Sequence, residues 1–380
     1  MPDTIKIKNI SNNKSSLSIE WNDGEKSNFN FLWLRDNCPS DIHPTARERQ
    51  FNLKDVSENI KPESFNLENN EKIKIKWSEG NHVSLYDISW LRRHCYTINN
   101  NKEYVSPYKL WDKNLSQNFE KITAEYGEVM ETEEGLIKWL EKLHHYGICI
   151  VKNTVTSKNS GFEILKRISH TRQTFFGTPF EVINIPNPNN QAYTAKGLFN
   201  HTDLPYFESA PGYQFLHCLV NDATGGNSSM VDAFKVADYL KKNDKEVFKT
   251  LVETSVKFTN NDYTQETIRI GHSPLINLNK DNDYNDIRFS VAQMGVVDCA
   301  PDVVEKFYKS YQKFAKLLHS KEYLVEFRLE KGDLFCFNNR RVVHGRTEFN
   351  PNSGHRHLQG YYIDRDEILG RMNYLKKIEL

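Results

Sequence analysis

Two short polar motifs that lie far apart in the sequence place the strongest constraint on how this chain folds. The first is His201-Thr202-Asp203, and the second is Val343-His344-Gly345. Two imidazoles and one carboxylate are the ligand set that binds a divalent iron on one face and leaves the other positions open. If these three side chains share one metal, the chain between them must lead back to the same place. A fold in which distant strands lie side by side meets that requirement.

The residues around each motif strengthen this interpretation. A histidine and an aspartate two positions apart are a weak signal alone, because a polar turn has the same composition. Here the apolar run Gln214–Val220 follows the first motif, and Asp333–Phe337 runs into the segment that carries His344. Both runs are typical of buried strands. Ligands placed at the ends of such strands are held rigidly, which a metal site requires.

A third feature is Arg356, which lies twelve residues beyond His344. A co-substrate such as 2-oxoglutarate chelates iron with its keto-acid end and leaves its far carboxylate to a fixed cation. A guanidinium offers a planar pair of donors that suits a carboxylate. For Arg356 alone, a surface salt bridge is the plainer interpretation. Because the candidate metal ligands are also present in the sequence, we favour the co-substrate role for Arg356.

The composition excludes several classes of protein. The 380 residues include 50 lysine and arginine residues and 50 aspartate and glutamate residues, so the formal net charge is zero. This balance gives no indication of a nucleic-acid partner or of an anionic membrane surface. No apolar run is long enough to span a bilayer, and the first residues lack the pattern of a secretory signal. Six scattered cysteines predict reduced thiols and favour the cytoplasm.

Residues 1–98 are predicted to form a small β-rich domain. Apolar and polar residues alternate in Ser16–Trp21 and again in Lys72–Trp77, which is the pattern of half-buried strands. A turn with a glycine follows each run, at Gly24 and at Gly80. No internal repeat stands out in this part of the chain.

The second predicted domain covers residues 115–380 and combines many short strands with few helices. Thr132-Glu133-Glu134 is an acidic helix start, and the apolar residues of one helical face follow it: Leu136, Trp139, Leu140 and Leu143. Gly147 ends this helix, and a further helix is expected from Val303 to Leu318. Short strands separated by turns make up most of the remainder. The predicted fold class is therefore mainly β with α, as a β-barrel or sandwich.

Beyond these patterns, the sequence resembles a known family. The resemblance runs in order along nearly the whole chain, in Trp33–Pro39, Ala192–Thr194, His201–Pro205, Phe215–Gly226, Phe337–His344, Arg356–Gly360 and Asp364–Glu367. On these segments the chain is similar to the gamma-butyrobetaine hydroxylase and trimethyllysine hydroxylase family of Fe(II)/2-oxoglutarate oxygenases. The segment Trp33–Cys38 is specific to this subfamily. The resemblance implies a double-stranded β-helix, or jelly roll, as the catalytic domain.

The resemblance also implies an activity and its cofactors. His201, Asp203 and His344 are expected to bind Fe(II), and Arg356 is expected to pair with the far carboxylate of 2-oxoglutarate. The expected reaction uses O2 to hydroxylate gamma-butyrobetaine to L-carnitine and releases succinate and CO2. Two alternatives stay open: a hydroxylase of trimethyllysine or another trimethylammonium compound, and a non-catalytic protein that binds a quaternary amine. The family resemblance further suggests a homodimer.

Four aromatic residues match the positions that surround the substrate's trimethylammonium group in the family: Phe176, Phe180, Tyr193 and Tyr362. A quaternary cation has no N–H group to donate, so π faces are its suitable receptor. Asn190 matches a residue that helps to hold the substrate carboxylate. In the animal butyrobetaine enzymes the first two positions are tyrosine and tryptophan, so the two phenylalanines leave the exact substrate open. Core packing is the alternative interpretation for any one ring.

The family resemblance raises the question of a second metal in the small domain. Family members bind a structural zinc there through three closely spaced cysteines and a downstream histidine. This chain keeps Cys38 and His82 at the matching places but lacks the other two cysteines, and His43 is the candidate for a third ligand. A closed zinc site takes four protein ligands. We therefore expect this loop to fold without metal.

Overall fold

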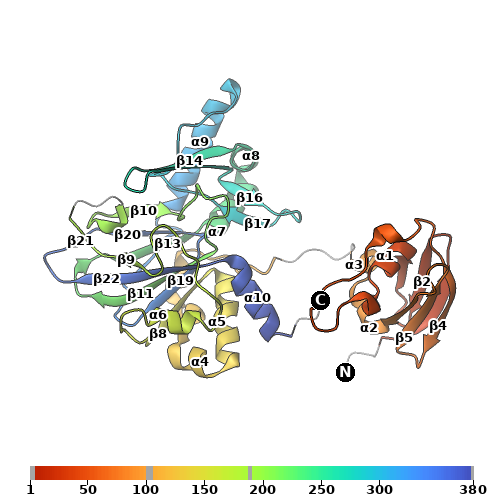
Figure 1. Ribbon diagram of the computed structural model, residues 1–380. Helices are drawn as coiled ribbons and strands as arrows, with labels where there is room; N and C mark the ends of the chain where they lie inside the picture. The colour runs from red at the N-terminus through yellow and green to blue at the C-terminus, as the bar shows by residue number, and fades with distance from the viewer. Residues whose placement is uncertain (1–4, 100–105, 187–190, 378–380) are drawn as a thin grey trace. The chain divides into compact units, whose positions relative to one another are not determined.

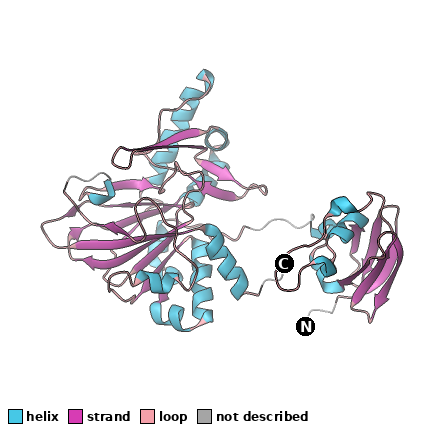
Figure 2. Ribbon diagram, viewed as in Figure 1, coloured by secondary structure: helices cyan, strands magenta, loops and turns pink. Residues whose placement is uncertain are grey.

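The structure is a computed structural model that describes residues 5–99, 106–186 and 191–377. The chain divides into two compact units, Met1–Val105 and Ser106–Leu380 (Figure 1). This division falls between residues 98 and 115, where the first predicted domain ends and the second begins. The N-terminal unit contains strands and short helices, and the C-terminal unit contains sheets, hairpins and longer helices (Figure 2).

Two three-stranded antiparallel sheets, each followed by a short helix, make up the N-terminal unit. The first group is β1 (Ile7–Asn12), β2 (Ser16–Trp21), β3 (Lys26–Asn30) and α1 (Phe31–Asp36). The second is β4 (Pro62–Glu68), β5 (Lys72–Trp77), β6 (Val83–Asp87) and α2 (Ile88–Arg93), with α3 (Tyr96–Asn99) after it. The predicted strands β2 and β5 are confirmed with the same bounds. Their alternate residues are buried because both sheets pack one face on a shared core.

The two groups are an internal repeat, which corrects the expectation that the sequence holds none. The matching residues are Trp21 and Trp77, Gly24 and Gly80, Trp33-Leu34-Arg35 and Trp90-Leu91-Arg92, and Cys38 and Cys95. In both halves a strand tryptophan donates its indole N–H to a serine hydroxyl, from Trp21 to Ser27 at 2.6 Å and from Trp77 to Ser84 at 2.8 Å. The repeat is faint in the sequence because the matches are few and one extra residue separates turn from helix in the second half.

Two sheets form the framework of the C-terminal unit. Their strands are β7 (Thr123–Glu125), β8 (Ile148–Lys152), β9 (Phe180–Val182), β10 (Leu198–His201), β11 (Tyr213–Asn221), β13 (Ser228–Asp232), β18 (Val325–Phe327), β19 (Leu334–Asn338), β20 (Val342–Arg346) and β22 (Arg356–Ile363). The larger sheet has six strands in the order β7, β8, β19, β11, β22, β9, and the smaller has four in the order β10, β20, β13, β18. Strands distant in sequence are therefore neighbours in space.

A common apolar core joins the two sheets. Its buried residues come from the larger sheet (Ile150, Cys218, Phe337 and Leu358) and from the smaller one (Met230, Val325 and Val342). Along β11, Leu216 and Cys218 contact this core, whereas Tyr213 and Phe215 pack into a second cluster with the helices. This central strand thus buries both of its faces. The predicted jelly roll, mainly β with α, is confirmed.

Helices cover the outer face of the larger sheet. They are α4 (Tyr126–Glu131), α5 (Glu133–Tyr146), α6 (Gly161–Leu165) and α10 (Arg365–Leu375) (Figure 1). The predicted apolar face of α5 is confirmed, because its four apolar residues have no exposed surface. The Thr132 hydroxyl accepts a hydrogen bond from the Gly135 N–H at the start of α5, and Gly147 ends it with φ of +74°.

A third group of elements packs against the smaller sheet through a separate apolar cluster that includes Val231 and Val343. It contains α7 (Ala233–Asn243), α8 (Lys245–Glu253), α9 (Pro301–Leu318) and the hairpins β14 (Val256–Asp262) with β15 (Thr267–Ser273) and β16 (Ile276–Leu278) with β17 (Tyr284–Ile287). A further two-stranded sheet pairs β12 (Thr224–Gly225) with β21 (Phe349–Asn350). The predicted helix Val303–Leu318 is confirmed as α9. No helix in the described ranges is long and apolar enough to cross a membrane.

Candidate active site

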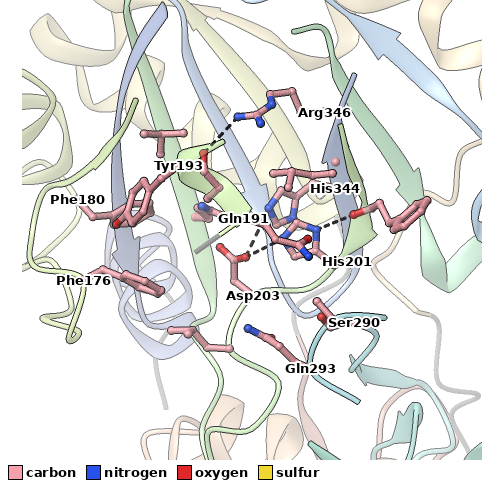
Figure 3. A pocket seen from close by; sticks show the side chains of 18 of the residues that line it. Phe176, Phe180, Gln191, Tyr193, His201, Asp203, Ser290, Gln293, His344 and Arg346 are labelled. Carbon is pink, nitrogen blue, oxygen red and sulfur yellow. Dashed lines mark hydrogen bonds and ion pairs between the residues drawn. The ribbon is translucent and has the colours of Figure 1, made fainter. Parts of the chain in front are cut away.

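A cavity of about 440 Å³ in the C-terminal unit brings the two polar motifs of the sequence together (Figure 3). His201 is the last residue of β10, and His344 lies opposite it on β20. The sequence placed both ligands at strand ends, which holds for His201 only. His344 lies inside a strand of its own, because the chain turns after β19 and enters the other sheet as β20.

The three candidate ligands, His201, Asp203 and His344, form a compact group that we call the ligand triad. Oδ1 of Asp203 lies 3.2 Å from Nε2 of His201 and 3.7 Å from Nε2 of His344. The donor atoms of all three residues lie within 4.8 Å of one another. Two imidazoles and a carboxylate at this spacing fit one divalent iron bound on one face.

Hydrogen bonds around the triad orient each ligand. Nδ1 of His201 lies 2.8 Å from the Phe199 carbonyl and donates there, so Nε2 is the ring nitrogen available to a metal. The Tyr362 hydroxyl donates to Oδ2 of Asp203 at 2.7 Å. The Asn339 side chain accepts from the Asp203 N–H at 2.7 Å and donates to its carbonyl at 3.0 Å. These contacts fix the carboxylate before any metal arrives.

The electrostatics of the triad shift the pKa of each of its three members. Burial and the neighbouring His201 lower the pKa of His344 to about 3. Burial alone would raise the pKa of Asp203, but His344, His201 and the Tyr362 hydroxyl outweigh it and hold that pKa well below its usual range. The same carboxylate raises the pKa of His201 against the effect of burial. The pKa directions of His344 and Asp203 thus favour the forms that bind a metal, whereas that of His201 opposes its neutral form.

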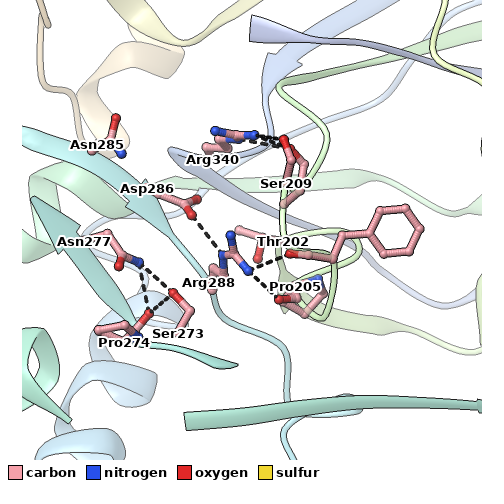
Figure 4. A network of polar contacts seen from close by, with 12 residues as sticks. Thr202, Pro205, Ser209, Ser273, Pro274, Asn277, Asn285, Asp286, Arg288 and Arg340 are labelled. Carbon is pink, nitrogen blue, oxygen red and sulfur yellow. Dashed lines mark hydrogen bonds and ion pairs between the residues drawn. The ribbon is translucent and has the colours of Figure 1, made fainter. Parts of the chain in front are cut away.

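The turn after Asp203 is held by a buried arginine (Figure 4). Leu204 has a φ of +54°, a backbone conformation that a branched residue adopts only under constraint. Nη1 of Arg288 donates to the carbonyls of Pro205 at 3.0 Å and Phe207 at 2.7 Å. Its Nε donates to Asp286 at 2.9 Å, which neutralises the buried charge. This network holds the turn that follows Asp203 and so helps to fix the position of Asp203.

Arg356 is the first residue of β22 and also lines the cavity. Only 9% of its surface is exposed, and burial lowers its pKa to about 10. In the described part of the chain its Nε has no hydrogen-bond partner, and no carboxylate lies within ion-pair distance. A buried charge without a counter-charge is costly. The cavity therefore offers a fixed cation to an anionic ligand.

The four aromatic residues predicted from the family resemblance line the same cavity, and we call them the aromatic wall: Phe176, Phe180, Tyr193 and Tyr362. The rings of Phe180 and Tyr362 stack at 5.0 Å between centroids, and that of Phe176 lies 6.1 Å from Phe180. Figure 3 places Phe176 and Phe180 on one side of the triad. Asn190 lies outside the described residues.

Several other polar residues of the cavity escaped the sequence analysis. They are Gln214 on β11, Asn260 and Asn261 on β14, Ser290 and Gln293 in the loop after β17, and Arg346 on β20. Gln214 is 4% exposed and carried a signal, because an isolated polar residue in a buried apolar strand needs a partner. The others carried none, because their position depends on which segments the fold brings beside the triad.

The candidate zinc ligands of the N-terminal unit meet only in part. Sγ of Cys38 lies 3.2 Å from Nε2 of His82, and these two residues form a cluster with Asp41. His43, the candidate third ligand, is not in this cluster. Its Nδ1 accepts hydrogen bonds from the backbone N–H groups of Thr45 and Ala46 at 3.3 and 3.1 Å.

A cation already occupies one corner of this cluster. The guanidinium of Arg35 forms an ion pair with Asp41, and both side chains are largely buried. Burial and this guanidinium lower the pKa of His82. Three donors beside a fixed positive charge do not fit a closed zinc site, which takes four protein ligands. The Arg35–Asp41 ion pair ties the loop to α1 in the way that a metal would.

Comparisons with known proteins agree with this architecture. The family model described as "Taurine catabolism dioxygenase TauD, TfdA family" matches residues 111–362, and that described as "Gamma-butyrobetaine hydroxylase-like, N-terminal" matches residues 8–92. The chain is 36% identical to gamma-butyrobetaine dioxygenase of Pseudomonas sp. (strain AK-1) over 96% of its own length and 94% of that protein. It is 30% identical to the mitochondrial trimethyllysine dioxygenase of Rattus norvegicus over 91% and 82%.

A solved structure supports the fold independently. The structure of AAD-2 in complex with Mn(II) and N-oxalylglycine matches with a TM-score of 0.51 at 11% identity, over 62% of this chain and 91% of that one. The sequence comparisons cover both units of the chain. The chain therefore belongs to the TauD, TfdA family of Fe(II)- and 2-oxoglutarate-dependent dioxygenases, and within it to the group that includes gamma-butyrobetaine dioxygenase and trimethyllysine dioxygenase.

Proposed function

We propose that this protein hydroxylates gamma-butyrobetaine to L-carnitine, with Fe(II), 2-oxoglutarate and O2, and releases succinate and CO2. The observation that carries the proposal is that one cavity holds the ligand triad, the unpaired cation Arg356 and the aromatic wall together. The 36% identity to a gamma-butyrobetaine dioxygenase over nearly the full length supports the same substrate.

In this proposal the triad, His201, Asp203 and His344, binds the iron. When bound, iron supplies the activation of O2 that an unreactive C–H bond requires. Arg356 pairs with the far carboxylate of 2-oxoglutarate, because a buried guanidinium with free donors matches a carboxylate in charge and geometry. Arg356 thus orients the co-substrate and neutralises the charge of its far carboxylate inside the cavity.

The aromatic wall receives the trimethylammonium group. Each well-placed ring contributes roughly 0.5–2 kcal/mol to binding of a cation. The stacked rings of Phe180 and Tyr362 both line the cavity, and the Tyr362 hydroxyl is turned to Asp203. A substrate held on this wall lies beside the triad, so the wall also sets which carbon is hydroxylated.

The polar lining of the cavity favours a betaine over trimethyllysine. Trimethyllysine carries a free α-ammonium group, for which a carboxylate is the strongest partner. Among the described lining residues the only carboxylate is Asp203, which the metal requires. Asn260, Asn261 and Gln293 instead offer amide donors that suit a carboxylate. The side-chain oxygen Oδ1 of Asn260 already accepts from Arg269 at 3.2 Å, which leaves the N–H groups of the same side chain to donate elsewhere.

The test is turnover of iron-reconstituted protein against a panel of trimethylammonium compounds. Protein loaded with Fe(II) without oxygen is exposed to O2 and 2-oxoglutarate, and succinate and hydroxylated product are measured together. We expect coupled product with gamma-butyrobetaine and much less with trimethyllysine, and none from the variant H201A. If only trimethyllysine gave coupled turnover, the proposed substrate would be wrong, and the proposed iron and 2-oxoglutarate would stand. No succinate release with any compound would favour a non-catalytic binding protein.

We also propose a homodimer in a reducing compartment such as the cytoplasm. The family resemblance supports the dimer, and the six free cysteines, five of them buried, support the reducing compartment. Sedimentation velocity of the purified chain tests the first point. A mass of one chain at micromolar concentration would contradict it.

A further inference from the structure

The segment Gln191–Gly197 carries Tyr193 into the cavity, although little packing holds it. None of its residues is fully buried. A segment of this kind takes its position from polar contacts rather than from an apolar core. The position of Tyr193 in the aromatic wall therefore depends on the groups that bind the backbone of this segment.

One guanidinium, that of Arg346, binds three carbonyls of that backbone, and Figure 3 shows one of these contacts as a dashed line. Nη2 of Arg346 donates to the carbonyls of Thr194 at 2.6 Å and Lys196 at 2.8 Å, and Nη1 donates to that of Ala192 at 3.4 Å. The planar fork of a guanidinium can bind several acceptors at once, which an ammonium cannot do in the same geometry. Arg346 is therefore the main polar anchor of the segment.

The anchor stands on the same strand as a candidate metal ligand. Arg346 follows His344 by two residues on β20, and alternate residues of a strand point to the same face. Both line the cavity. Across the strand pair, His344 lies opposite His201, and Arg346 lies opposite Leu198, where the anchored segment enters β10. His344 of the ligand triad and the segment that carries Tyr193 are thus positioned by one strand.

Arg346 also lies beside the cation of the co-substrate site. The guanidinium groups of Arg346 and Arg356 lie 5.0 and 5.5 Å from the centroid of the Phe349 ring. Only 6% and 9% of their surfaces are exposed, and in the described residues neither has a carboxylate within ion-pair distance. Burial and Arg356 lower the pKa of Arg346 to about 10. Two buried like charges repel until an anion joins them.

We propose that Arg346 is a positioning residue that links the co-substrate site to the aromatic wall. Binding of a dicarboxylate at Arg356 supplies the missing negative charge, which relieves the repulsion and strengthens the hydrogen bonds from Arg346 to Ala192, Thr194 and Lys196. Tyr193 is then held more firmly when the co-substrate is present. This inference rests on the proposed function in so far as the wall receives the substrate.

The first test compares two variants that make the same chemical change. Arg328 binds the carbonyls of Asn221, Ala223 and Gly225, but it does not line the cavity, so R328K is the matched control for R346K. We expect R346K to raise the KM for gamma-butyrobetaine about tenfold, because two charged hydrogen bonds to the segment are lost. The kcat and the KM for 2-oxoglutarate should change much less, and R328K should leave all three close to wild type.

The second test does not depend on the substrate. Amide hydrogen exchange over residues 192–198 is measured by mass spectrometry in the presence of Mn(II), without oxygen, with and without 2-oxoglutarate. In the wild type and in R328K we expect 2-oxoglutarate to slow exchange in this segment. In R346K the segment should exchange faster, and 2-oxoglutarate should no longer slow it.

The two tests separate the inference from the proposed function. Unchanged exchange in the wild type on addition of 2-oxoglutarate would overturn the inference, even if R346K fails to fold. Equal effects of R346K and R328K on exchange would also overturn it, since both would then act through general stability. If exchange behaves as expected but no trimethylammonium compound is turned over, the link between the sites stands and the proposed substrate is wrong.

Discussion

The Tyr362 hydroxyl donates a hydrogen bond of 2.7 Å to Oδ2 of Asp203, so one residue serves both the aromatic wall and the ligand triad. Burial and the adjacent Asp203 raise the pKa of Tyr362 far above its usual value, which keeps the hydroxyl protonated as a donor. The ring of the same residue stacks on Phe180. Removal of the hydroxyl alone should therefore separate the two roles.

We expect Y362F to weaken Fe(II) binding about fivefold and to leave the KM for gamma-butyrobetaine nearly unchanged, because a hydrogen bond is lost and the ring is kept. The measurement is turnover as a function of free Fe(II). Tyr361, the preceding residue, offers a matched control. It packs between the larger sheet and the helices that cover it, and its hydroxyl donates to Gln359 instead of Asp203. Equal loss of iron affinity in Y361F would show that the effect is not specific to the Asp203 contact.

Replacement of a wall ring should affect the substrate rather than the co-substrate. We expect Y193L to raise the KM for gamma-butyrobetaine by about three- to thirtyfold, since one cation–π contact is lost, and to change the KM for 2-oxoglutarate less than about twofold. The exposed Tyr374 of α10 lies outside the cavity, so Y374L is the control and should match the wild type. Similar increases in both KM values would contradict the assignment of Tyr193 to the wall.

Stability should fall in acid through a buried histidine that is not part of the triad. His217 has no exposed surface and neither ring nitrogen has a partner among the described residues, and burial lowers its pKa from 6.5 to about 4. Between these two pH values the unfolded chain binds a proton that the folded chain does not. The free energy of unfolding should therefore decrease as the pH falls from about 6.5 to about 4, by up to about 3 kcal/mol from this residue.

Urea unfolding as a function of pH measures this contribution. The variant H217L cannot take up the proton, so its stability should fall less steeply over the same window than that of the wild type. The exposed His319 provides the matched substitution H319L, which should keep the wild-type slope. A slope for H217L identical to that of the wild type would remove His217 as a source of acid sensitivity.

The N-terminal unit should contain no stoichiometric zinc. Elemental analysis of protein purified without chelators should find zinc at less than about a tenth of the chain concentration, since three donors beside Arg35 do not make a closed site. Chelator treatment should not change the melting temperature of this unit. The variant C38S and its repeat counterpart C95S provide the comparison. One zinc per chain in the wild type, lost in C38S and kept in C95S, would show that the cluster binds metal.

The sequence by itself determined the parts of this protein that depend on short-range patterns. Alternating residues predicted the strands Ser16–Trp21 and Lys72–Trp77, and helical spacing predicted the buried face of α5. The candidate ligands His201, Asp203 and His344 were visible because metal binding needs particular side chains at particular spacings. The pattern of short strands predicted a β-barrel or sandwich, and the family resemblance implied the jelly roll.

Tertiary structure decided which other residues join the candidate metal ligands in the cavity. Arg346, Asn260 and Gln293 have ordinary surroundings in the sequence, and only the pairing of β10 with β20 and the packing of β14 beside them bring these side chains to the cavity. Likewise, His43 was the candidate third ligand by sequence, but its ring accepts from its own loop's backbone, and Asp41 lies beside Cys38 instead. Contacts between distant segments are set by the packing of the whole core, which no local pattern records.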